Sequence, residues 1–118
     1  MKDFCIIGSG ISGATIANTL SKKYSLDLYD KARGVGGRSS NKKFNKNESF
    51  DHGAQYISPK SIEFKRFIKK LIDKRIVKSW PGKHVFLNTD KKEDKKHIKI
   101  IGKNGNNAIS KYLLKDIN

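Results

Sequence analysis

A short apolar stretch that runs into three spaced glycines most constrains the fold of this chain. The sequence "DFCIIGSGISGATIANTL" places Phe4–Ile7 directly before Gly8, Gly10 and Gly13. An apolar run of this length that stops at a glycine is typical of a parallel strand that is buried on both faces. Small and apolar residues then recur at helical spacing as far as Leu20, and lysines follow, where a helix dipole favours them. We therefore predict a strand, a tight turn and a helix.

A second predicted strand completes a β-α-β unit. We predict this strand over Leu26–Tyr29, and it ends at Asp30. In such a unit the first glycine permits the tight turn, the second lets the backbone approach a pyrophosphate, and the third lets helix and strand pack closely. The pyrophosphate meets free N–H groups at the helix N-terminus, and an acid after the second strand accepts hydrogen bonds from a ribose. The pattern predicts an α/β fold of Rossmann type that binds a dinucleotide. An ordinary glycine turn, with Asp30 as a turn residue, is the alternative.

A second glycine cluster follows the acid, in the sequence "DKARGVGGR". Backbone at Gly34, Gly36 and Gly37 can come close to a long dinucleotide, and Arg38 can meet its phosphate charge. A flexible surface loop is the alternative reading of the same residues. The polar residues after this cluster, to position 47, show no periodicity, and we interpret them as a surface segment.

The remaining sequence predicts mixed elements without an internal repeat. Apolar residues between 61 and 75 fall on one helix face with lysines opposite them, and Trp80-Pro81-Gly82 is typical of a turn. We predict a short strand and turn within 49–57, a helix over 61–75, strands at 84–89 and 97–102, and a final helix over 107–117.

The net charge of +15 raises the question of nucleic-acid binding. All but four of the 26 basic residues are lysine, and isoleucine and asparagine are also frequent, so A/T-rich coding accounts for much of the charge. The chain contains no known nucleic-acid-binding motif. The lysines of the 61–75 helix are explained by solvation, so the sequence does not favour nucleic acid as a partner.

The single cysteine, Cys5, excludes a disulfide within the chain and fits a reducing compartment. Because it lies in a strand predicted to be buried, we expect it to pack in the core. No apolar run has the length of a membrane span, and the first strand begins too close to Met1 for a signal peptide. We expect a cytoplasmic protein with no membrane partner. His52, His84 and His97 lack metal-ligand spacing, so no metal site is predicted.

Three stretches resemble one protein family. The sequences "IIGSGISGATIA", "DKARGVGGR" and "FDHGAQYI" closely resemble the N-terminal FAD-binding region of renalase-like flavoproteins, within the flavin amine oxidase group. The later "NAISKYLL" resembles a helix start found further along in that family. The resemblance implies a partial Rossmann-type FAD/NAD(P)-binding fold. Residues 1–57 would be the FAD-binding β-α-β unit and glycine-rich loop, and residues 58–118 a helix, a β-hairpin and a final helix that begin a substrate domain.

The resemblance also implies which residues bind FAD, which the family holds non-covalently. The positions carried over are Gly8, Gly10, Ile11, Ser12 and Gly13 at the pyrophosphate, Asp30 at the ribose, Lys31, Arg33, Gly37 and Arg38 along the adenosine and diphosphate, and Ala54, Gln55 and Tyr56 near the isoalloxazine ring. Most of the wider group has glutamate at the ribose position, and the shorter Asp30 is shared with renalase-like members. Within the third motif, His52 is interpreted as a local structural residue.

The activity that the resemblance implies is oxidation of a small-molecule substrate by the flavin, which passes the electrons to oxygen. The substrate would be a reduced nicotinamide in renalase-like members and an amine in the wider group. Neither the pattern nor the resemblance assigns a catalytic residue. Family members are much longer than this chain, so we expect it to be inactive alone. The alternatives are a gene fragment, a reduced form with another use, or a non-catalytic dinucleotide-binding subunit that needs a complementing C-terminal chain.

Overall fold

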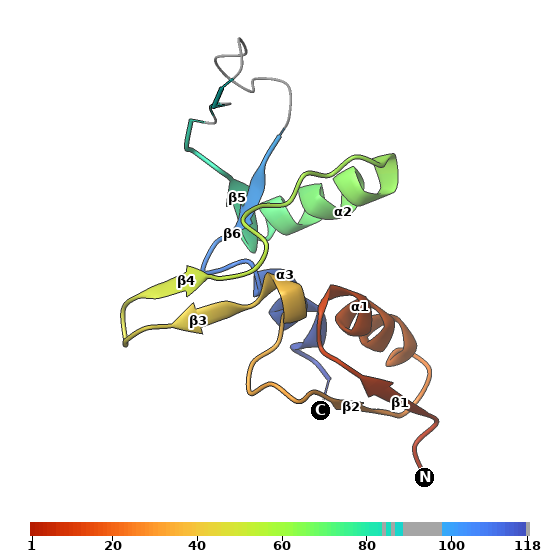
Figure 1. The fold of residues 1–118 in the computed structure, drawn as a ribbon. Coiled ribbons are helices and arrows are strands. Elements are labelled where there is room, and N and C mark those ends of the chain that lie inside the picture. Colours follow the sequence, from red (N-terminus) through yellow and green to blue (C-terminus); the bar gives the residue numbers. More distant parts are fainter. Residues whose placement is uncertain (84, 86, 89–97, 118) are drawn as a thin grey trace.

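The structure is a computed structural model that describes residues 1–83, 85, 87, 88 and 98–117. The elements, in chain order, are β1 (Phe4–Ile7), α1 (Ile11–Leu20), β2 (Leu26–Tyr29), the 3-10 helix η1 (Gly37–Ser39), β3 (Asn41–Lys43), β4 (Ser49–Asp51), α2 (Ile62–Asp73), β5 (Val77–Ser79), β6 (Ile100–Gly102) and α3 (Ala108–Leu114). Figure 1 shows β1, α1 and β2 at one end of the molecule, α2, β5 and β6 at the other, and α3 between them.

The predicted β-α-β unit is confirmed. β1 and β2 pair in parallel, with Phe4 opposite Leu26 and Ile7 opposite Tyr29. The α1 helix begins directly after Gly10. Its fully buried residues, Ala14 and Ala17, are small, so the helix can approach its neighbours closely. The carboxyl ends of both strands and the N-terminus of α1 therefore meet at one edge of the unit, where a parallel α/β sheet places its ligands.

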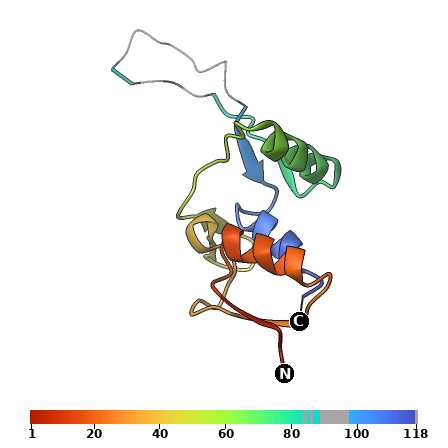
Figure 2. The same ribbon diagram turned by 90° about the vertical axis from the view of Figure 1, so that its right-hand side faces the viewer.

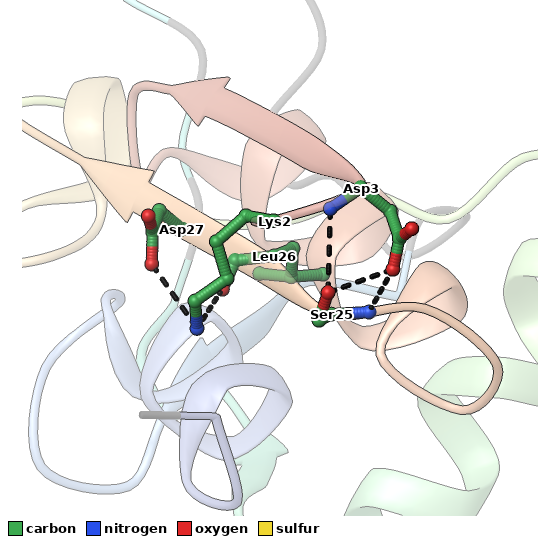
Figure 3. Close-up of polar contacts among 5 residues, drawn as sticks. All are labelled: Lys2, Asp3, Ser25, Leu26 and Asp27. Atoms are coloured by element: carbon green, nitrogen blue, oxygen red, sulfur yellow. Dashed lines mark hydrogen bonds and ion pairs between the residues drawn. The ribbon is translucent and has the colours of Figure 1, made fainter.

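Polar contacts tie the two strands together at the opposite edge (Figure 3). The N–H and the hydroxyl of Ser25 donate to the Asp3 carboxylate at 2.8 and 2.7 Å. Beside them, the Lys2 ammonium lies 3.3 Å from the Asp27 carboxylate and 3.5 Å from the Leu26 carbonyl. A two-stranded sheet is marginal by itself, so these contacts help to fix the start of both strands.

The expectation that β1 and Cys5 are buried is wrong. Phe4, Cys5 and Ile7 are all exposed, and only Ile6 is partly buried. The Ile6 side chain lies 3.7 Å from the Cβ position of Gly13, so it faces α1, and the period of two along a strand turns Cys5 and Ile7 to the other face. Among the described residues β1 pairs with β2 alone, and no element covers that second face.

The core connects the two ends of the molecule through α3. Figures 1 and 2 both show α3 beside α1, and the Asn18 amide of α1 donates to the Leu113 carbonyl at 2.8 Å. The buried apolar cluster draws on α1, α2, β5, β6 and α3. It consists of Ala14, Ile68, Leu71, Val77, Ile100, Ile109 and Leu113. The final helix, predicted over 107–117, thus supports the β-α-β unit from a distant part of the sequence.

The segment interpreted as an irregular surface stretch contains a strand instead. β3 pairs antiparallel with β4, with Asn41 opposite Asp51. The turn between them is closed by Asn45, whose side-chain oxygen accepts hydrogen bonds from the N–H groups of Asn47 and Glu48. β3 carries no apolar alternation, and its pairing comes from this turn and from β4.

The helix predicted over 61–75 is confirmed as α2, and the Ser61 hydroxyl caps it by accepting from the Phe64 N–H at 3.2 Å. β5, which the sequence analysis did not assign, pairs antiparallel with β6. The strand predicted at 84–89 falls partly outside the described residues, and among those described the partner of β6 is β5. No helix in the described part of the chain has the length and apolar character needed to cross a membrane.

Candidate functional site

A hollow of about 500 Å³ opens where the first glycine turn meets the second glycine loop. It is lined by the end of β1, the N-terminus of α1 and η1. The lining residues are Ile7, Gly8, Gly10, Ile11, Ser12, Gly13, Gly36, Gly37, Arg38 and Ser39. Seven of the predicted cofactor positions therefore meet here: Gly8, Gly10, Ile11, Ser12, Gly13, Gly37 and Arg38.

Backbone contacts hold the two glycine turns against each other. The Gly36 N–H donates to the Ser9 carbonyl at 3.0 Å, and Gly36 pairs with Gly10 as a short parallel bridge. A Cβ on Gly37 would lie 3.2 Å from the Gly10 Cα, and Gly37 has a φ of +53°, which favours glycine. The second loop therefore lies against the first turn and forms one cradle with it.

The glycines of the first turn serve two different purposes. A Cβ on Gly13 would lie 1.9 Å from the Gly8 carbonyl oxygen, so Gly13 is needed for α1 to pack on β1. A Cβ on Gly10 would have nothing closer than the Gly37 Cα at 3.8 Å, which is ordinary contact. The fold itself thus accepts a side chain at Gly10, and the missing side chain keeps the hollow open. A Cβ at Gly10 would partly fill the hollow. Its absence leaves room for a pyrophosphate to approach the backbone N–H groups closely.

Ser9 is a site residue that the sequence analysis missed. It is 1% exposed, and its N–H and hydroxyl both donate to Asp30 Oδ2 at 2.6 Å. The Ala32 N–H donates to Asp30 Oδ1 at 2.8 Å. These bonds, that of the Ser9 hydroxyl foremost, lower the pKa of Asp30 to about 2. Asp30 lies beside the hollow and does not line it, and it is ionised at neutral pH. The sequence did contain a signal for this contact, because Ser9 stands between two motif glycines and an acid follows the next strand.

The predicted cations occupy different positions around the cradle. Arg38 lines the hollow and is exposed, whereas Lys31 and Arg33 lie in the exposed loop after Asp30 and do not line it. None of the three forms an ion pair with another described residue. The charges of Arg33 and Arg38 are thus available to an anionic ligand at the edge of the cradle, whereas the charge of Lys31 also acts on the neighbouring Asp30 carboxylate.

Ala54, Gln55 and Tyr56 lie beside the cradle and not in its lining. The Ala54 N–H donates to the Arg38 carbonyl at 2.8 Å, which ties this stretch to η1. The Tyr56 ring contacts Trp80, with ring centroids 5.6 Å apart, and the Lys99 ammonium lies 5.1 Å from its centre. Their approach to a flavin ring stays a prediction.

His52 contacts Ser40, with its Nε2 3.2 Å from the Ser40 hydroxyl. This contact fits the local role that the sequence analysis gave it.

Two neighbouring asparagines at the start of α3 fix both sides of the site, and the sequence analysis identified neither. Asn106 is fully buried, and its amide nitrogen donates to the carbonyls of Ala54 and Gln55 at 2.7 and 3.0 Å. Asn107 is 5% exposed, and its amide nitrogen lies 3.4 Å from the Val35 carbonyl. The residues that lead into α3 therefore support the glycine loop at Val35 and the chain at Ala54 and Gln55 together.

A larger hollow of about 900 Å³ lies between the β3–β4 hairpin and the start of α3. Lysine and asparagine side chains dominate its lining, and it contains none of the predicted cofactor positions. The smaller hollow, with its two glycine turns, is therefore the candidate site.

The chain is similar in fold to part of a solved oxidase. A double mutant of putrescine oxidase, made in a redesign of its cofactor binding, superposes on 72% of this chain at 26% identity and a TM-score of 0.51. The wild-type enzyme bound to putrescine superposes on 79% of this chain at 23% identity and a TM-score of 0.52, which shows similarity of fold alone. The chain spans about a fifth of the length of these oxidase chains, 18% and 21%.

A family model described as the NAD(P)-binding Rossmann-like domain matches residues 6–71, which is more than half of the chain. The match contains the end of β1, all of α1 and β2, both glycine turns and Asp30. By its sequence, its parallel β-α-β unit and its glycine cradle, this chain belongs to the NAD(P)-binding Rossmann-like domain family.

Proposed function

We propose that the chain binds FAD in the glycine cradle, as the dinucleotide-binding part of an amine-oxidase-like flavoprotein. The observation that carries the proposal is the pairing of Gly10 with Gly36, because it joins two glycine turns into one backbone-lined hollow. The first turn alone can hold a pyrophosphate, and the second turn adds backbone to the same cradle. The resemblance of the "DKARGVGGR" and "FDHGAQYI" stretches to renalase-like flavoproteins, and the likeness in fold to putrescine oxidase, support FAD over NAD(P).

The residues of the chain would divide the work of holding FAD. N–H groups at the start of α1, around Ser12 and Gly13, would bind the pyrophosphate. Arg38, at the rim of the hollow, would offset the negative charge of the pyrophosphate. Asp30 would accept a hydrogen bond from the ribose. When bound, FAD would supply a ring that accepts a hydride from an amine or a reduced nicotinamide. No described side chain is assigned as an acid or a base.

A second candidate function is nucleotide binding without catalysis until a complementing polypeptide is present. The exposed second face of β1 favours this candidate, because Ile7 is 79% exposed there. Parallel sheets are normally covered on both faces, so this surface suits a further element of the same fold. The two candidates differ in one respect. In the first, the FAD-loaded chain itself oxidises an amine or a reduced nicotinamide; in the second, which agrees with the expectation that the short chain is inactive alone, oxidation needs a partner.

The test is to incubate the purified chain with FAD, remove free flavin on a desalting column and record the visible absorption spectrum. We expect about one flavin per chain. Gly10→Ala is the informative variant, because the fold has room for its Cβ but the hollow loses space for the pyrophosphate. Gly34→Ala is the matched control, since a Cβ at Gly34 meets nothing within 4 Å and Gly34 does not line the hollow.

We expect Gly10→Ala to fold normally and lose at least about tenfold in FAD affinity, with Gly34→Ala unchanged; tenfold corresponds to about 1.4 kcal/mol. A colourless wild-type chain would reject FAD binding by this chain. Equal flavin retention by wild type and Gly10→Ala would place the flavin outside the cradle. Turnover of putrescine or reduced nicotinamide by the loaded chain would then decide between the two candidates.

A further inference from the structure

We propose that Ser9 is a positioning residue of the nucleotide site, whose hydroxyl holds the Asp30 carboxylate against the glycine turn with one oxygen turned outward for a ribose hydroxyl. The inference rests on the proposed function, because it concerns the same cradle. Ser9 itself is buried and does not line the hollow, so it would act through Asp30 and not by touching the nucleotide.

The hydrogen bonds of Asp30 define its remaining capacity. An ionised carboxylate offers about four acceptor sites, two on each oxygen. Oδ2 already accepts two bonds from Ser9, both 2.6 Å long, and Oδ1 accepts one from the Ala32 N–H at 2.8 Å. One acceptor site on Oδ1 is left. The carboxylate can therefore accept one of the two ribose hydroxyls without giving up a bond that it makes in the free protein.

The Ser9 hydroxyl contributes to this arrangement in a way that the backbone does not. If the hydroxyl is removed, the Ser9 N–H and the Ala32 N–H still bind one carboxylate oxygen each. With two bonds in place of three, the carboxylate is freer to tilt relative to the glycine turn. Asp30 is exposed, so no packing restrains it in place of the lost bond. The low pKa of Asp30, about 2, has the Ser9 hydroxyl as its largest cause and agrees with the geometry.

The same pairing of a serine with an aspartate at the other edge of the sheet supplies a matched control. The Ser25 N–H and hydroxyl donate to Asp3 Oδ2 at 2.8 and 2.7 Å (Figure 3). Ser25→Ala therefore removes the same kind of bond from the same two strands, away from the cradle.

The test compares Ser9→Ala with Ser25→Ala by calorimetric binding of ADP, 2′-deoxy-ADP and 3′-deoxy-ADP at pH 7. In the wild-type chain we expect one deoxy nucleotide, and not both, to bind about tenfold more weakly than ADP, as for one hydrogen bond to a charged group. Ser9→Ala should bind ADP about fivefold more weakly and reduce that tenfold preference to about threefold or less. Ser25→Ala should leave both quantities unchanged.

A second measurement needs no nucleotide. NMR titration of the Asp30 side-chain carboxyl should show its pKa moving up toward the ordinary 3.8 in Ser9→Ala but not in Ser25→Ala. If the wild-type chain binds ADP and Ser9→Ala keeps the full preference between the nucleotides, the inference is overturned and the proposed function stands. If the wild-type chain binds neither ADP nor FAD, both are overturned.

Discussion

Asp3 and Ser25 join the starts of β1 and β2 through two hydrogen bonds from one serine to one carboxylate oxygen. The hydroxyl of Ser25, and then its N–H, lower the pKa of Asp3 below the ordinary 3.8. Asp30 and Ser9 repeat the arrangement at the ends of the same strands. Ionised aspartates thus hold the two parallel strands together at both of their ends, and the stability of the sheet should depend on the charge of these aspartates.

We predict that stability falls as the pH is lowered through the range from about 4 to 2. Both Asp3 and Asp30 have lower pKa values in the folded chain than in the unfolded chain. Their contribution is therefore complete above the unfolded value, and it disappears as the pH falls through the folded value, which for Asp30 is about 2. Urea denaturation at a series of pH values measures the free energy of unfolding and should show this decline.

Ser25→Ala isolates the share of Asp3 in that decline. The variant should be less stable than the wild type at pH 7, and the difference should shrink as the pH falls below the ordinary pKa of 3.8 and Asp3 takes up a proton in both proteins. Ser21→Ala is the control, because the Ser21 hydroxyl donates to the Asn18 carbonyl, which does not titrate. A Ser25→Ala deficit that stays constant with pH would contradict the assigned role of Asp3.

Substitutions at Gly13 and Gly10 should separate stability from ligand binding. A Cβ at Gly13 would lie 1.9 Å from the Gly8 oxygen, so α1 must shift on β1 in Gly13→Ala, at a cost of about 1–3 kcal/mol. Gly10→Ala places a Cβ where there is room, at the N-cap of α1, and should cost about 1 kcal/mol or less. Thermal denaturation without nucleotide measures both, and a greater loss in Gly10→Ala would contradict the close packing of Gly13 on the Gly8 carbonyl.

The parts of the fold that follow from local pattern were predictable from the sequence. β1, α1 and β2 depend on apolar spacing and on a glycine turn, and both are visible within thirty residues. β3 and β5 were not predictable in this way, because Asn41–Lys43 and Val77–Ser79 have no strand alternation. Their pairing depends on partners reached through a turn or through a distant segment, so tertiary context decides the strand.

The cradle was predictable in outline, but not the side chains that support it. The spacing of the motif glycines can be recognised in the sequence. Ser9 and Asn106 are harder to distinguish from other polar residues, because their contacts form only in the folded chain. The Asn106 side chain meets the Ala54 and Gln55 carbonyls across half of the sequence. The prediction that Cys5 is buried was wrong for a different reason. The strand pattern predicted burial, but burial needs a second layer, and the described chain places none over that face.

We predict that Asn106→Ala is among the most destabilising single substitutions in the chain. The side chain accepts from the Gly102 N–H at 2.9 Å and donates to two carbonyls in a fully buried position. Each buried group left without a partner costs about 1–3 kcal/mol, so we expect a loss of at least about 2 kcal/mol by urea denaturation. Asn104→Ala, at an exposed position two residues earlier, should cost less than about 0.5 kcal/mol. Similar losses in the two variants would refute this role for Asn106.

Cys5 should react with a thiol reagent while the chain is folded. It is exposed, it lies on the second face of β1, and it is the single cysteine of the chain, so the reaction reports on one site. We expect iodoacetamide to modify it fully without denaturant, with an unchanged circular dichroism spectrum, because its side chain points away from α1. Modification that begins only at the urea concentration that unfolds the chain would show that the face is covered. If Cys5 does react in the purified chain, a polypeptide that completes the sheet should protect it when added, because that layer would cover the second face of β1.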